Sequence, residues 1–346
     1  MPGSVDAGST LLTTALMVVC YLVIVRLVDM NEKEPLWAMA AFFILGAGVS
    51  VALVQAVGTP VLDLQPLLGA VIKEVARFGA IGVGVVGLLI YGRKRGWDEF
   101  NGLLDGIVYG ATVGLGFATA REVMNQLLLA SFVVPGEEAG MFAGFHKVFL
   151  TGLAEGIFGA IIGAGIGAAV ESRSKALRVV WPIVGLGAAM AANWGYVALG
   201  KGNALGGTQG LIRAQIALAL PVVIVVAVVV FALLSERRAI RDQLASEQEA
   251  GVVTAADLSL LTSVLARETT YLKTLLSGKI GPWLKLKVLH NRQVQLAFVK
   301  QSASNETDPK RKGRFEEEIA NLRKCILDHQ KALESAGVRK GEEKQS

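Results

Sequence analysis

Four polar side chains suited to hydrolysing a peptide bond lie inside long apolar stretches of this sequence. They are Glu74, Glu122, His146 and Asn193. A carboxylate and an imidazole can act as a general base that takes a proton from water. An asparagine amide can donate a hydrogen bond to the oxyanion that develops at the attacked carbonyl. Because ionisable groups inside a bilayer usually mark function, these residues are candidates for a catalytic site.

The stretches that carry these residues are long enough to cross a membrane. Hydrophobic residues make up 53% of the 346 residues. About 20 apolar residues span the hydrocarbon of a bilayer as a helix. Seven such blocks occur, at about 9–28, 36–58, 66–92, 102–130, 142–169, 179–200 and 212–234. The sequence therefore predicts an all-α protein, a bundle of about seven transmembrane helices. The first block is expected to be one of these helices rather than a cleaved signal peptide.

The balance of charge changes near residue 235. Residues 1–235 carry 14 basic and 14 acidic side chains, whereas residues 236–346 carry 20 and 15. We expect a transmembrane domain over 1–235 and a cytosolic helical tail over 236–346. The positive excess of the tail suits an anionic inner leaflet, and its basic run at 310–314 is interpreted as solvated or lipid-facing rather than as a nucleic-acid site. The tail helices are expected at about 236–249, 254–276, 283–302 and 314–335.

The loops indicate how the chain is oriented. Basic clusters follow the third, fifth and seventh blocks, at 93–95, 173–178 and 237–241. Short loops rich in lysine and arginine stay in the cytosol. The N-terminus is therefore predicted outside and the C-terminus inside. With this orientation and a rise of 1.5 Å per residue, all four candidate side chains lie roughly 6–12 Å below the outer surface, so a single polar cavity is expected.

Three basic side chains in the same blocks allow a structural alternative. Lys73, Arg77 and Arg121 can neutralise the carboxylates of Glu74, Glu122 and Asp105 as a network of ion pairs. Lys73 and Arg77 are four residues apart, so they share one face of a helix.

A zinc site is the competing chemical interpretation. Its ligands would be Glu74, Glu122 and His146, because carboxylates and imidazole bind zinc. The sequence contains no HExxH motif, and its two cysteines, Cys20 and Cys325, lie in different regions. No cofactor is therefore predicted, with a divalent metal as the alternative.

Several motifs follow one another within residues 20–200. DMNEKEP at 29–35 is an acidic loop that ends in Glu-Pro, and KEVAR stands at 73–77. FNGLLDGIVYGATVGLGFATARE at 100–122 is the longest motif, and FAGFH follows at 142–146. In this order the motifs resemble the PrsW family of intramembrane proteases, within the superfamily of CAAX-type prenyl endopeptidases.

The resemblance implies functional roles for Glu74, Arg77, Glu122, His146 and Asn193. The family motif at 73–77 begins with two glutamates, and here Lys73 stands at the first of them. The last motif carries a histidine four residues before the asparagine, and here Ala189 stands in its place.

The resemblance also implies a substrate class and a location. It implies membrane-anchored protein substrates, such as anti-sigma factors, cut near the outer face of a bacterial plasma membrane. Two alternatives stay open from the residues. One is a catalytically impaired protein that binds a transmembrane helix or a lipid-anchored partner, and the other is an ion-coupled carrier.

Overall fold

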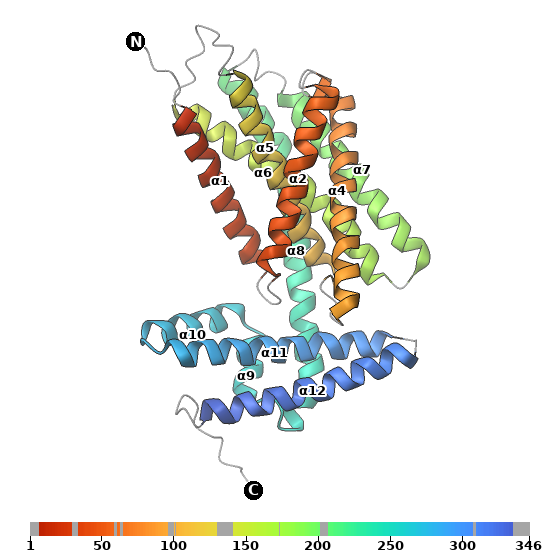
Figure 1. The fold of residues 1–346 in the computed structure, drawn as a ribbon, viewed down its shortest axis with the longest axis vertical. Coiled ribbons are helices and arrows are strands. Elements are labelled where there is room, and N and C mark those ends of the chain that lie inside the picture. Colours follow the sequence, from red (N-terminus) through yellow and green to blue (C-terminus); the bar gives the residue numbers. More distant parts are fainter. Residues whose placement is uncertain are drawn as a thin grey trace. The chain divides into compact units, whose positions relative to one another are not determined.

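The computed structural model describes residues 7–29, 34–58, 61–62, 65–95, 100, 102–129, 141–172, 174–200, 207–306 and 309–334. Arg173 of the predicted basic loops lies outside these residues. The described residues form eleven α-helices and no strand, which confirms the all-α class. Figure 1 traces them from α1 to α12. Their bounds are α1 Ala7–Val28, α2 Leu36–Val57, α4 Pro66–Arg95, α5 Leu103–Leu129, α6 Met141–Glu171, α7 Lys175–Gly200, α8 Gly207–Glu249, α9 Ala255–Leu261, α10 Val264–Leu276, α11 Ile280–Asn305 and α12 Pro309–Glu334.

Seven of the described helices, α1, α2 and α4–α8, are long and apolar enough to cross a membrane. This confirms the seven predicted spans, and the observed limits differ from the predicted ones by a few residues at most ends. The exception is the seventh span. Its helix, α8, continues without a break from Gly207 to Glu249, because the charged residues that follow the apolar block are good helix formers.

Helices α5 and α6 form the most buried pair in the membrane unit, and glycine makes their contact possible. Gly106 faces Gly163, Gly110 faces Gly159, and Gly114 faces Glu155. Each step of four residues along α5 matches a step of four back along α6, so the helices are antiparallel in a fixed register. A Cβ on Gly110 or Gly163 would overlap a backbone carbonyl of the other helix. Small residues let helix backbones approach this closely in membranes.

The same device holds α5 against α2 and α6 against α7. Gly46 of α2 lies against the backbone of Val113, and Gly116 of α5 lies against the backbone of Phe43. Between α6 and α7, a Cβ on Gly165 would lie 3.0 Å from the Cα of Gly185. Helix α5 is therefore the centre of the unit, with its sides fixed by α2 and α6.

The chain divides into two compact units, with the boundary between Val230 and Phe231, inside α8. The second unit holds the end of α8 and helices α9–α12. The predicted tail helix at 254–276 is two helices, because Ser263 caps the start of α10 by accepting a hydrogen bond from the amide of Ala266. Thr254 caps α9 in the same way, because its hydroxyl oxygen accepts a hydrogen bond from the amide of Asp257 at 3.1 Å.

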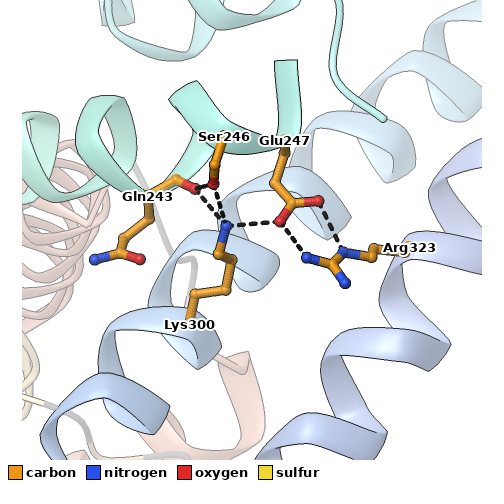
Figure 2. A network of polar contacts seen from close by, with 5 residues as sticks. All are labelled: Gln243, Ser246, Glu247, Lys300 and Arg323. Carbon is orange, nitrogen blue, oxygen red and sulfur yellow. Dashed lines mark hydrogen bonds and ion pairs between the residues drawn. The ribbon is translucent and has the colours of Figure 1, made fainter. Parts of the chain in front are cut away.

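An ion-pair network around the buried Glu247 ties three helices of the second unit together (Figure 2). Glu247 of α8 is 1% exposed and accepts two hydrogen bonds from Arg323 of α12, at 2.6 and 2.8 Å. Lys300 of α11 donates to the same carboxylate at 2.6 Å and also to the carbonyl of Gln243 and the hydroxyl of Ser246. Such bidentate charged contacts orient the helices around the apolar core of this unit.

Candidate functional site

Arg77 joins two buried carboxylates in the middle of the membrane unit. Its guanidinium donates to Glu74, one turn earlier on α4, and to Glu155 on α6. The side chains of Arg77 and Glu74 are wholly buried. The guanidinium also lies over the ring of Phe117 from α5, 4.7 Å from its centroid. Three helices thus surround one positive charge, which is stable only because it is paired and stacked.

Asn193 of α7 completes the surroundings of Glu74. Its Nδ2 atom donates to one carboxylate oxygen of Glu74, while Arg77 donates to the other. A carboxylate oxygen has two lone pairs, so each retains one acceptor site. Among the described residues, Asn193 Oδ1 and Arg77 Nε are buried without a hydrogen-bond partner. The site therefore combines a carboxylate with a further acceptor and a further donor beside it.

Arg121 reaches the same cluster from α5, since its Nη1 lies 3.2 Å from Glu155. Helix register places Arg121 seven residues beyond Gly114, the residue level with Glu155, which is about 10 Å along the axis. Side chains lean toward the N-terminus of their own helix. In an antiparallel pair Arg121 and Glu155 therefore lean toward each other, and their long side chains cover the distance.

Lys73 is also buried, at 1% exposure, one residue before Glu74 on α4. Its positive charge acts on Glu155. The structure thus contains a network of ion pairs. Arg77 pairs with Glu74, as the sequence suggested, and both Arg77 and Arg121 pair with Glu155, which that alternative did not include. Sequence reasoning did not give Glu155 a role, although an ionisable residue in an apolar block was a sufficient signal. Its partners, 78 and 34 residues away, could not be identified from spacing.

His146 lies near the other end of α6, and its imidazole Nε2 is 2.6 Å from Nε2 of Gln215 on α8. Nine residues separate it from Glu155, about 13 Å along the helix. The α5–α6 register, carried eight residues past the Gly114–Glu155 contact, sets Glu122 level with position 147. The structure joins Glu74 to Asn193 directly. A catalytic role for Glu122 and His146 in the same cavity stays a prediction.

A second buried polar group lies at the start of α2, outside the apolar spans. Asp29 accepts hydrogen bonds from Arg26, at 3.0 Å, and from the backbone amide of Glu34, at 2.6 Å. The hydroxyl of Tyr109 from α5 donates to the Glu34 carboxylate. This contact joins Glu34 of the acidic motif, whose residues 30–33 lie outside the described part of the chain, to Tyr109 of the long motif at 100–122. Burial, with repulsion from Asp105, raises the pKa of Glu34 to about 11.

Replacing Glu34 with glutamine is expected to flatten the pH dependence of stability. Between a pKa of about 4.5 in the unfolded chain and about 11 in the folded protein, the carboxyl of Glu34 holds its proton only in the folded state. The free energy of unfolding therefore falls as the pH rises above about 4.5. Between about pH 5 and pH 8 the melting temperature of the parent should drop by at least roughly 3 °C more than that of the variant. Glu316→Gln, at an exposed site of α12, is the control. Equal slopes for Glu34→Gln and the parent would contradict the prediction.

The cluster around Arg77 is unsuited to holding a metal ion. Its two carboxylates are bridged by the Arg77 guanidinium, and a metal ion would be repelled by the positive charges of Lys73, Arg77 and Arg121. Within the described ranges, no three histidine, cysteine or acidic side chains come together as ligands. Zinc sites ordinarily use three or four such ligands.

Comparison with known proteins gives one match. Residues 34–234 match the family described as PrsW family intramembrane metalloprotease. Neither a curated protein nor a solved structure matches the chain. The matched segment covers more than half of the 346 residues and contains Glu34, Arg77, Glu155 and Asn193. The chain therefore belongs to the PrsW family of intramembrane proteases.

Proposed function

We propose that this protein is a membrane peptidase that cleaves membrane-anchored protein substrates, with Glu74 and Asn193 at the centre of its site. The carrying observation is their direct hydrogen bond, between residues 119 positions apart that both lie in the matched family segment. The basic loops support a site that opens toward the outer face, with the N-terminus outside and the C-terminal tail in the cytosol.

In the proposed reaction a water attacks the carbonyl carbon of the substrate peptide. Glu74 takes the proton of this water through a free lone pair and then delivers it to the leaving amine nitrogen. Arg77 fixes the orientation of the carboxylate. The second N–H of Asn193 or the Nε–H of Arg77 is a suitable donor for the oxyanion. Glu122 and His146 are proposed as a second acid–base pair acting on the same substrate.

The family description names a metalloprotease, but the described side chains around Glu74 do not fit a metal. Arg77, Arg121 and Asn193 already donate to the carboxylate oxygens of Glu74 and Glu155. His146, the histidine of the membrane unit, contacts Gln215. The proposed steps therefore use protein groups alone.

Glu74→Gln is expected to reduce cleavage by roughly 100-fold or more, because glutamine keeps the shape of the side chain but accepts no proton. The measurement is the rate at which the purified full chain cuts a tagged single-span protein in liposomes. Glu249→Gln, an exposed change on α8, should keep the parent rate. His146→Ala tests the second pair separately. A Glu74→Gln variant that folds and cuts at the parent rate would refute the proposal.

A second candidate function is a protease-fold protein that binds a transmembrane helix without cutting it. Its supporting observation is the burial of Lys73 and Arg77, which bring two positive charges to carboxylates that a peptidase needs as bases. Under this alternative the parent can be crosslinked to a substrate helix but yields no fragments. Lys73→Glu together with Ala189→His would then be required for cleavage to appear.

A further inference from the structure

From the middle of α10 to the end of α11, the hairpin that these two helices form carries basic side chains and no acidic ones. Residues 269–305 contain no aspartate or glutamate, although the segments on either side of them, 236–268 and 306–346, contain all 15 acidic residues of the tail. Six lysine and arginine residues stand in this segment. Lys273 lies in the last turn of α10, and Lys279 immediately precedes α11. A like-charged segment of this length attracts an anionic surface.

The same hairpin exposes large apolar side chains. They are Leu272, Leu275, Leu276, Ile280, Leu284 and Val288, hereafter the hairpin patch, and each is at least 40% exposed. On α11 the members recur every four residues and so form one stripe. The two helices meet at a tight turn around Gly278 (Figure 1), which places the last residues of α10 next to the first residues of α11.

The hairpin patch is not required by the core of the unit. Tyr271 of α10 and Leu289 of α11 are buried on the inner faces of the two helices, and Leu289 belongs to the apolar core with Ile240 and Leu322. The residues of the hairpin patch lie on the exposed faces of the two helices, opposite these buried side chains. Helix α12 differs, because its described exposed surface is mostly charged, with acidic and basic residues together.

Lysine, leucine and tryptophan are arranged here as in helices that lie in a bilayer interface. Lys287 stands over the ring of Trp283, 5.1 Å from its centroid. Lysine stems cover apolar surface while their ammonium groups reach phosphate, and tryptophan favours the headgroup region. Helices of this type bind through apolar insertion together with attraction to anionic lipid.

We propose that the hairpin patch docks on anionic phospholipid of the leaflet from which the tail emerges. The occupant is chosen by charge. Lys300 is paired with Glu247, and the other five cations of the segment, with no carboxylate between them in the sequence, complement a phosphate surface. Continuity of α8 from the last span into the tail supports the choice, because it tethers the hairpin to a bilayer at high effective concentration.

The test places a spin label at Leu276→Cys or, as a control, at Glu317→Cys on α12. Cys20 and Cys325 are changed to serine in the full chain. Each protein is inserted into nanodiscs of phosphatidylcholine alone or with phosphatidylglycerol. Label accessibility to oxygen, which is soluble in lipid, is compared with accessibility to a water-soluble nickel chelate. Position 276 should favour oxygen only with phosphatidylglycerol, and position 317 should favour nickel in both lipids.

Charge reversal separates electrostatic docking from other contacts. K273E/K279E/K285E/K287E should abolish the oxygen preference at position 276, as should high salt, which screens the phosphates. K312E/R314E/K324E/K331E changes the net charge by the same amount on α12 and should leave the oxygen preference at position 276 unchanged. Equal accessibility at position 276 in the two lipids would overturn the proposal. The proposal would also be overturned if the label at position 276 were shielded from the nickel chelate in both lipids and this shielding disappeared with one copy per disc. That result would indicate contact between copies.

Discussion

Replacing Arg77 with methionine is expected to lower the free energy of unfolding by about 3–5 kcal/mol, because it removes the guanidinium that bridges two buried carboxylates. Glu74 and Glu155 would then face each other in an apolar interior without the guanidinium that bridges them. Arg121→Met is the matched comparison, since Arg121 is 15% exposed and its Nη1 lies 3.2 Å from Glu155. The free energy of unfolding should fall clearly less in Arg121→Met than in Arg77→Met. The measurement is unfolding of the purified protein in detergent.

A second substitution distinguishes the charge effect from lost packing. In the Arg77→Met background, Glu74→Gln removes one of the two carboxylate charges that Arg77 bridges in the parent, and should recover part of the lost stability. The same change in the parent should reduce stability, since it breaks a satisfied pair. This opposite sign is a coupling energy of the kind a double-mutant cycle measures. If the two changes simply add, or if Arg77→Met costs no more than Arg121→Met, the bridging role is wrong.

Replacing Gly110 with alanine is expected to cost about 3 kcal/mol, at the upper end for overpacking, although alanine is the better helix former. The new Cβ would overlap the backbone of Gly159, and a backbone carbonyl cannot rotate away as a side chain can. Helices α5 and α6 must separate, and Arg121 must then move relative to Glu155. Cleavage should fall together with stability in this variant.

Gly187→Ala is the control for this prediction. A Cβ at Gly187 meets nothing within 4 Å, so the change should be neutral or stabilise the protein by up to about 1 kcal/mol. Thermal unfolding of both variants in the same detergent gives the comparison. If Gly110→Ala and Gly187→Ala behave alike, the α5–α6 contact is looser than the structure indicates.

The fold was largely predictable because its main signals are local. The seven spans follow from length and apolar composition, and the cap at Thr254 follows from residue types three positions apart. Small residues at 114–117 and 159–167 also indicate close helix contacts from the sequence alone. The extent of α8 was harder to predict, because the sequence does not mark the end of a helix when the residues after the apolar span are themselves good helix formers.

The candidate site was only partly predictable. Glu74 and Asn193 were both chosen from the sequence, and the structure joins them. Glu155 was given no role, although it pairs with Arg77 and Arg121. Which charges meet depends on the rotation and register of each helix, and composition does not encode either.

The sequence by itself determined that seven apolar helices carry a small set of ionisable residues, because hydropathy and residue type are local properties. Only the tertiary structure decided that Arg77 bridges Glu74 and Glu155 while His146 contacts Gln215. The physical reason is that such contacts depend on how each helix is rotated and placed against its neighbours, which close packing at glycine and the cost of an unpaired charge in an apolar interior decide together.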